Sequence, residues 1–272
     1  MTLLQSFILA LVQGITEFLP ISSSAHLVIF SDLFGWQGHS LFFDLMVHLG
    51  TGLALVAYFW RDLLDMVRKW KIWWFKIFIG VLPAGLAGFV LRDWFENSFR
   101  SANFALLFLL MGSLLMLGAE VFRKRIALDG VAGANDLAGL DNLDIVNLDV
   151  SAKQAFSVGL FQVLALFPGF SRSGSTISGG MLVGLKRPSA AKFSFLLSIP
   201  LILGAGLYEL INAPVEVFQS SAIGSVLVGV AISFLSGLFC VNFLMKFLKN
   251  NSLIPFVVYR VFLILVILLF LF

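Results

Sequence analysis

Residues 13–26 read QGITEFLPISSSAH, a stretch in which a proline and three serines interrupt an apolar run that extends over 3–30. A second apolar run, 153–185, is interrupted in the same way by PGFSRSG at 168–174. Broken backbone at membrane depth is tolerated only where protein or water covers it. We therefore predict that both runs form re-entrant helical hairpins, which turn back before they cross the membrane.

The rest of the chain is typical of a membrane protein. Of its 272 residues 60% are hydrophobic and only 12% are charged, whereas about a quarter of a soluble domain is charged. Six further segments are apolar, nearly free of charge and close to the roughly 20 helical residues that cross a bilayer. They are 41–60, 76–92, 103–122, 193–211, 219–245 and 253–272. We predict an all-α integral membrane protein with six transmembrane helices plus the two hairpins.

Loop charges orient these segments, because cytoplasmic loops carry an excess of Lys and Arg. The basic clusters at 61–76, 123–125, 186–192 and 246–249 share one side if 153–185 leaves and re-enters on that face. The loop at 92–100, whose charges balance, then lies on the outer side of the membrane, as do Glu209 and Glu216. Residues 1–40 enter the membrane from this outer side.

One hairpin followed by three spans would thus occur twice, with opposite orientation. Residues 1–125 and 153–272 are expected to form an inverted repeat, joined by a linker at 126–152 whose five aspartates we expect to be solvated. The order Leu-x-Gln, then Phe, Pro and serines, occurs at 11–24 and again at 160–173. Inverted repeats with paired interrupted segments indicate a site near the midplane, where the halves meet.

The first hairpin carries unusual polar side chains for such a position. Gln13 and Glu17 are four residues apart and share one face of a helix. An unpaired carboxylate in hydrocarbon costs at least about 2.5–3.5 kcal/mol, so an intramembrane Glu17 indicates function. The alternative is that Glu17 pairs with Arg172 as a structural link between the halves. Ser22, Ser23, Ser24 and His26 lie beside Glu17.

The second hairpin carries Arg172 within a run of serines and glycines. Arginine is the side chain best suited to phosphate, and the free N–H groups at the start of the following helix favour an anion. Gly-Ser-rich stretches also serve close helix packing in membranes, but packing needs no buried cation. We predict that Arg172 clamps an anion, and that the two hairpins form one buried site for a phosphate-bearing ligand.

Other polar residues receive weaker interpretations. Asp44 and His48, four residues apart in the first span, could support the site as a second shell or form a local hydrogen-bonded pair, and both readings stay open. We expect Tyr259 and Arg260 to snorkel to the interface, and His39 to be solvated at the outer surface.

The two motifs resemble those of a known family. QGITEFLPISSSAH resembles the E/Q-x-x-x-E and P-x-S-S-x-x-H signature of bacterial undecaprenyl-pyrophosphate phosphatases, the bacitracin-resistance family, and PGFSRSGST at 168–176 resembles its second signature, P-G-x-S-R-S-x-x-T. The resemblance covers essentially the whole chain. It implies an enzyme of the bacterial cytoplasmic membrane that removes the terminal phosphate of undecaprenyl pyrophosphate. This reaction recycles the carrier for peptidoglycan synthesis and hinders bacitracin. A divalent cation, Mg²⁺ or Ca²⁺, is the implied cofactor.

Phosphoryl transfer needs mainly correct positioning of the phosphate and neutralisation of its charge. These two needs suggest a role for each polar residue of the motifs. We expect Arg172 to clamp the pyrophosphate and Glu17 to hold the cation, supported by Gln13. Gln13 stands where many family members have Glu, which shifts metal binding towards Glu17. Ser23 is the expected nucleophile, with His26 to activate it or to protonate the leaving group; attack by water with His26 as base is the alternative. The expected phosphate-binding residues are Ser22, Ser24, Ser171, Ser173, Gly174 and Thr176.

Two other functions share some of these sequence features. A lipid-phosphate translocase is the main alternative, since inverted repeats with broken hairpins also describe secondary transporters. A phosphatidic-acid-phosphatase-type enzyme needs a second histidine after its Ser-Arg motif, and none follows His48. A net charge of +3 without a basic tract argues against nucleic acid. We expect the lipid substrate and membrane lipids as partners, leave a homodimer open, and expect the site to face the outer, periplasmic side.

Overall fold

The computed structural model describes residues 1–36, 41–91, 102–128, 150–213 and 222–271, together with Trp94, Ser98 and Leu148. Its regular structure is helical throughout, as predicted for an all-α protein. The helices are α1 (Leu3–Phe18), α2 (Ser23–Leu33), α3 (Leu41–Tyr58), α4 (Trp60–Arg68), α5 (Trp70–Val90), α7 (Ala102–Leu128), α8 (Ala152–Val163), the 3₁₀ turn η3 (Leu164–Leu166), α9 (Arg172–Leu182), α10 (Arg187–Asn212), α12 (Ala222–Asn250) and α13 (Ile254–Leu271).

Four of the described helices, α5, α7, α10 and α12, are long and apolar enough to cross a membrane. They confirm the spans predicted at 76–92, 103–122, 193–211 and 219–245. The segment predicted at 41–60 coincides with α3, which reaches span length only together with α4, and a 70° bend separates these two helices. The last predicted span coincides with α13, which is apolar but shorter over its described part, Ile254–Leu269.

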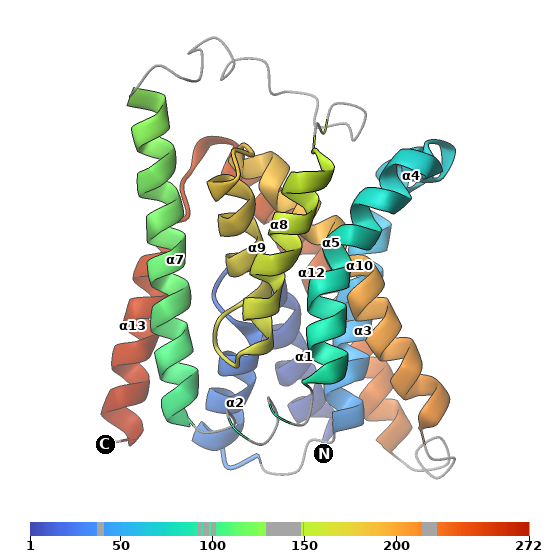
Figure 1. Cartoon of the computed structure of the whole chain (residues 1–272). Helices are drawn as coiled ribbons and strands as arrows, with labels where there is room; N and C mark the ends of the chain where they lie inside the picture. The colour runs from blue at the N-terminus through green and yellow to red at the C-terminus, as the bar shows by residue number, and fades with distance from the viewer. Residues whose placement is uncertain are drawn as a thin grey trace.

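The path of the chain is clear in Figure 1. Helix α1 rises from the lower end to the middle of the molecule, and α2 returns to the lower end. Helices α3, α5 and α7 then run up, down and up. Helix α8 enters from the upper end, stops near the middle and is followed by α9, which returns upwards. Helices α10, α12 and α13 run down, up and down, so that both termini lie at the lower end.

The upper end in Figure 1 is formed by α4, by the last turns of α7 and α12 and by the turn between α9 and α10. These segments carry Arg68, Arg125, Lys249 and Lys186. The clusters predicted to be cytoplasmic therefore share one end, as the loop-charge argument requires. Of the other charged positions in that argument, Glu209 lies near the end of α10. Arg92, Asp93, Glu96, Arg100, Glu216 and the linker aspartates lie outside the described residues, as does His39.

Helices α1 and α8 begin with the same capping motif. The residue before each helix, Thr2 or Ser151, accepts a hydrogen bond through its side chain from the backbone N–H of the glutamine three residues on. The side chain of that glutamine, Gln5 or Gln154, accepts a hydrogen bond from the backbone N–H of the capping residue. A capping box of this kind satisfies two donors that a helix start leaves free. The two motifs lie 149 residues apart in the sequence.

The same spacing relates the two breaks. Ser22 and Ser171, again 149 residues apart, have φ values of 74° and 75°, and they are the only non-glycine residues of the described chain with positive φ. Each immediately precedes the returning helix, α2 or α9. Such backbone costs of order 1–3 kcal/mol and persists where the surroundings enforce it, most often at functional sites. The two breaks are thus built alike, and both are strained.

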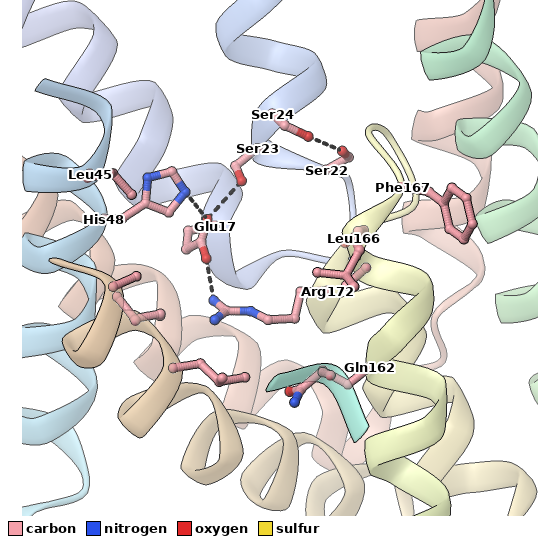
Figure 2. A pocket seen from close by; sticks show the side chains of 16 residues that line it. Glu17, Ser22, Ser23, Ser24, Leu45, His48, Gln162, Leu166, Phe167 and Arg172 are labelled. Carbon is pink, nitrogen blue, oxygen red and sulfur yellow. Dashed lines mark hydrogen bonds and ion pairs between the residues drawn. The ribbon is translucent and has the colours of Figure 1, made fainter. Parts of the chain in front are cut away.

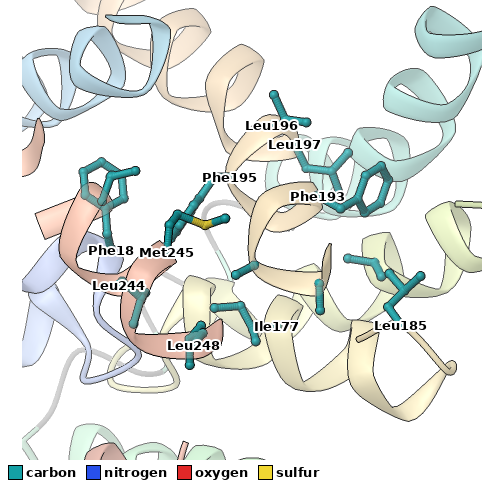
Figure 3. Close-up of a cluster of buried hydrophobic side chains, with 14 of the residues drawn as sticks. Phe18, Ile177, Leu185, Phe193, Phe195, Leu196, Leu197, Leu244, Met245 and Leu248 are labelled. Atoms are coloured by element: carbon teal, nitrogen blue, oxygen red, sulfur yellow. The ribbon is translucent and has the colours of Figure 1, made fainter. Parts of the chain in front are cut away.

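An apolar cluster holds the breaks in place. Figure 3 shows Phe18, at the end of α1, beside side chains of α10 and α12. The rings of Phe18 and Phe195 meet edge to face with centroids 5.5 Å apart, and Met245 and Ile177 belong to the same buried cluster. Because this cluster joins α1, α9, α10 and α12, it fixes the position of one break relative to the other.

Candidate functional site

A cavity of about 330 Å³ lies where the two breaks meet (Figure 2). Its polar lining consists of Glu17, Ser22, Ser23, Ser24, His48, Gln162, Ser171 and Arg172. Its apolar lining comes mainly from α3, α5, η3 and α10, and includes Leu45, Ala84, Leu166, Leu201, Ile202 and Ala205. A cavity lined by both polar and apolar side chains fits a ligand with a polar head and an apolar chain.

Glu17 is the centre of the polar wall. Its Oε1 accepts a hydrogen bond from Nη2 of Arg172 in a close ion pair that joins the two hairpins. Its Oε2 accepts from Gln13 Nε2 and from Ser23 Oγ, both at 2.8 Å. The Arg172 side chain is 19% exposed and lines the cavity, so the ion pair is a link between the halves and part of the cavity wall at once.

His48 also faces Glu17. Its Nε2 lies 3.5 Å from Glu17 Oε2, and its Nδ1 is 2.7 Å from the backbone oxygen of Asp44. Since a carbonyl oxygen only accepts, Nδ1 carries a proton and Nε2 is the nitrogen turned to the carboxylate. A local hydrogen bond to the Asp44 backbone therefore orients His48, which lines the cavity and faces Glu17. A supporting role of this pair in the site stays a prediction.

His26 lies behind the cavity wall rather than in it. The ring is buried, with Nδ1 2.7 Å from the backbone oxygen of Ser22 and Nε2 2.7 Å from the hydroxyl of Tyr259. In the neutral ring Nδ1 donates to Ser22 and Nε2 accepts from Tyr259. The hydroxyl of Ser23 is bonded to Glu17 instead. A catalytic role for His26 therefore stays a prediction, and the carboxylate of Glu17 is the base nearest to Ser23.

The serines of the second break have several partners. Ser171 Oγ accepts from the N–H of Gly174 at 3.2 Å and caps α9. Ser173 donates to the backbone oxygen of Leu19 at 3.0 Å and so ties the second break to the first. Thr176 donates to the backbone oxygen of Arg172 at 2.7 Å. Of the predicted phosphate-binding residues here, Ser171 lines the cavity, whereas Ser173, Gly174 and Thr176 shape the break from behind.

The sequence profile of the family described as bacitracin resistance protein BacA matches residues 6–266. The chain belongs to this family. Relatives named undecaprenyl-diphosphatase include proteins of Alteromonas mediterranea (38% identical, over 96% of this chain and 95% of the relative), Caldicellulosiruptor bescii (38%, over 99% and 98%) and Hahella chejuensis (39%, over 96% and 95%). With several helices long and apolar enough to span a bilayer, this member of the BacA family is a multi-pass membrane protein.

This BacA-family chain buries Arg260 completely, so the prediction that Arg260 snorkels to the interface is wrong. The residue is 0% exposed. Its guanidinium donates to Ser113 Oγ at 2.9 Å and to four backbone oxygens, those of Leu109 (2.7 Å), Gly169 (3.0 Å), Phe170 (3.3 Å) and Pro20 (3.5 Å). Three of these carbonyls belong to the two breaks. The five donors of an arginine satisfy acceptors that broken helices leave free.

Tyr259 and Gln162 are further residues that the sequence reasoning did not assign to the site. The hydroxyl of Tyr259 is bonded to His26 although the residue is 39% exposed, and Gln162 lines the cavity. The available signal for Arg260 was its presence in an otherwise apolar span, since intramembrane ionisable groups are functional candidates by default. The signal for Gln162 was its place in the repeated Leu-x-Gln pattern.

The side chains around the cavity indicate how a metal ion could be bound there. Within the described ranges no three His, Cys, Asp or Glu side chains converge on a metal position, and Glu17 is the carboxylate of the cavity lining. Oε1 of Gln13 is buried and has no partner among the described residues. Mg²⁺ is commonly held by one or two carboxylates together with substrate phosphates. The residues present fit a cation shared with a phosphate ligand.

We predict that Arg260→Lys destabilises the protein. Lysine keeps the charge but offers three donors from one point, so carbonyls of the breaks lose their partners, at about 1–3 kcal/mol. Thermal unfolding in detergent should show a midpoint lower by several degrees. Arg125→Lys, at an exposed position of α7, is the matched control and should change nothing measurable. An unaltered midpoint in Arg260→Lys would refute the bracing role.

Proposed function

We propose that the protein is an undecaprenyl-diphosphatase. It hydrolyses the terminal phosphate of undecaprenyl pyrophosphate to undecaprenyl phosphate and phosphate, which recycles the lipid carrier for peptidoglycan synthesis and confers bacitracin resistance. The observation that carries the proposal is the cavity itself. Arg172 and Glu17, one from each hairpin, line one cavity together with apolar residues of α3, α5 and α10, and near-full-length relatives bear this name.

The architecture we propose is an inverted repeat of six transmembrane helices and two re-entrant hairpins. The hairpins are α1–α2 and α8–α9, within repeats 1–125 and 153–272. The 149-residue spacing of the capping motifs and of Ser22 and Ser171 supports the repeat. The entry of the two hairpins from opposite ends of the molecule in Figure 1 supports the inversion.

In the reaction we propose, Ser23 Oγ attacks the terminal phosphorus and Glu17 takes the hydroxyl proton across the 2.8 Å hydrogen bond. The bond between that phosphorus and the bridging oxygen breaks, and undecaprenyl phosphate leaves with the electron pair. Water then hydrolyses the phosphoserine. Arg172 neutralises charge on the phosphate oxygens throughout. Direct attack by water, with Glu17, His48 or His26 as base, is the alternative step.

We also propose that Mg²⁺ or Ca²⁺ is held by Glu17 with support from Gln13. When bound, the cation supplies neutralisation of phosphate charge. The single carboxylate of the lining supports this assignment, because a diphosphate brings the remaining oxygen ligands itself. Gln13 lies behind the lining and supports Glu17 through a 2.8 Å hydrogen bond.

The proposed location is the bacterial cytoplasmic membrane, with the site open to the periplasmic side. Leu45 and His48 line the cavity near the start of α3, and Ala84 and Ala205 line it in the later parts of α5 and α10. In Figure 1 helix α3 starts at the lower end and helices α5 and α10 run down towards it, so these four positions belong to the lower halves of the three helices. By the positive-inside rule the lower end faces outwards.

We predict that the detergent-solubilised protein releases phosphate from undecaprenyl pyrophosphate, that a chelator stops the release, and that Mg²⁺ or Ca²⁺ restores it. Arg172→Ala should lose at least about 100-fold in kcat/KM, because the phosphate charge is left unneutralised. Transport cannot occur in detergent micelles, because they have no two sides. An absence of phosphate release in micelles would therefore favour the lipid-phosphate translocase. Release that persists in chelator would remove the cation from the proposal.

Ser23→Ala separates the two forms of the chemical step. If Ser23 is the nucleophile, turnover should fall by at least about 100-fold, because the covalent route is closed. Acid quenching of the wild-type protein with substrate labelled at the terminal phosphate should leave label on Ser23. Near-normal turnover in the variant, with no label in the wild type, would establish attack by water.

Sidedness is predicted from the placement of the cavity. In proteoliposomes of defined protein orientation, substrate confined to the leaflet that corresponds to the periplasmic face should be hydrolysed at the rate seen in detergent. Substrate in the other leaflet should react at least about tenfold more slowly, limited by its movement across the bilayer. Equal initial rates from both leaflets would contradict an outward-opening site.

A further inference from the structure

The side chain of Gln162 is buried in the wall of the cavity without a partner. It is 2% exposed, yet neither its Oε1 nor its Nε2 finds a hydrogen-bond partner among the described residues. It extends from α8 into the space below Arg172 in Figure 2. Buried amide groups are nearly always hydrogen-bonded, and an exception indicates a missing ligand or a functional role.

The corresponding residue of the first hairpin explains why the amide lacks a partner. Gln13 stands 149 residues earlier, and its Nε2 donates to Glu17, the residue four positions on, at 2.8 Å. Four positions after Gln162 stands Leu166, which offers no acceptor. A carboxylate at that point would satisfy the amide but repel a phosphate. With leucine there, the N–H₂ group of Gln162 stays available to an anion.

The geometry points to Gln162 as the residue that binds the phosphate attached to the lipid, an inference that rests on the proposed phosphatase function. Ser23 and Glu17 lie on one side of Arg172 in Figure 2, and Gln162 lies on the other. A terminal phosphate in reach of Ser23 places the next phosphate towards Gln162. Ala165 and Leu166, three and four residues after Gln162, contribute to the apolar lining of the cavity, which suits the lipid chain. The amide donates to non-bridging oxygens of this phosphate without adding charge.

Gln162→Leu tests the inference, with Ser178→Ala as its control. Leucine keeps the approximate volume and removes both amide atoms. Ser178 Oγ is likewise buried and unpartnered, but Ser178 does not line the cavity. Since both changes remove buried polar atoms that lack partners, neither should lower the unfolding temperature of the ligand-free protein. A lowered unfolding temperature in Gln162→Leu would show a structural role and overturn the proposal.

Inhibition by the two products identifies the phosphate that Gln162 contacts. In Gln162→Leu the KM for undecaprenyl pyrophosphate and the inhibition constant for undecaprenyl phosphate should both rise about tenfold, while the inhibition constant for inorganic phosphate stays unchanged. Gln162→Glu, which places a negative charge there, should raise the first two constants further. Weaker inhibition by inorganic phosphate alone, or no change in any constant, would overturn the assignment. Ser178→Ala should leave all three constants unchanged.

The same variants separate this inference from the proposed function. If the wild-type protein releases no phosphate, the thermal shift caused by undecaprenyl phosphate still reports binding. That shift should be smaller in Gln162→Leu than in the wild type if Gln162 binds the lipid-attached phosphate. An equal shift would overturn the inference even in a protein that is an active phosphatase.

Discussion

The structure depends on how the backbone at its two breaks is satisfied in a region without water. Helices are the usual solution in a membrane because they pair every N–H and C=O internally. At Pro20 and at Gly169–Phe170 this pairing stops, and the fully buried guanidinium of Arg260 donates to the carbonyl oxygens there. One side chain from the last helix thereby holds both breaks, although the first lies 240 residues away in the sequence. The precision of the site follows from this bracing.

The ion pair of Glu17 and Arg172 has a different character. Removing two charges from water costs more than a buried pair usually returns, so such a pair is weak evidence of stability. Here both members line the cavity, and Glu17 takes further hydrogen bonds from Gln13 and Ser23. Within the pair the two charges offset each other. In the proposed function, a phosphate would compete with Glu17 for the guanidinium, so that binding the ligand would also free the carboxylate.

Much of this arrangement could be predicted from the sequence because it depends on local patterns. Apolar length located the spans, interrupted apolar runs located the breaks, and the rarity of charge in the chain marked Glu17 and Arg172. The 70° bend between α3 and α4 could not be predicted in this way, since neither helix has a residue that forces it. The position of His26 behind the wall was also out of reach, because helical spacing places residues on a face without showing what that face meets.

The burial of Arg260 shows the same limit more sharply. In an apolar helix near a membrane surface, an arginine can extend to water or turn inward, and only the neighbours decide between these outcomes. Those neighbours are the breaks, which belong to distant parts of the chain. The breaks pair only part of their own backbone, so their remaining carbonyl oxygens require a donor from elsewhere in the fold. Arg260 is that donor.

The two hairpins also show how similar backbones can carry different chemistry. Ser22 and Ser171 give both breaks the same strained turn, and the next residue begins a helix whose N–H groups attract an anion. That residue is Ser23 in one hairpin and Arg172 in the other. Four positions after the paired glutamines, one hairpin has Glu17 and the other Leu166. The first break therefore combines a hydroxyl with a carboxylate, and the second combines a cation with an amide. Because the chain brings the breaks together from opposite ends, the proposed mechanism has a group that reacts with the phosphate facing groups that hold it.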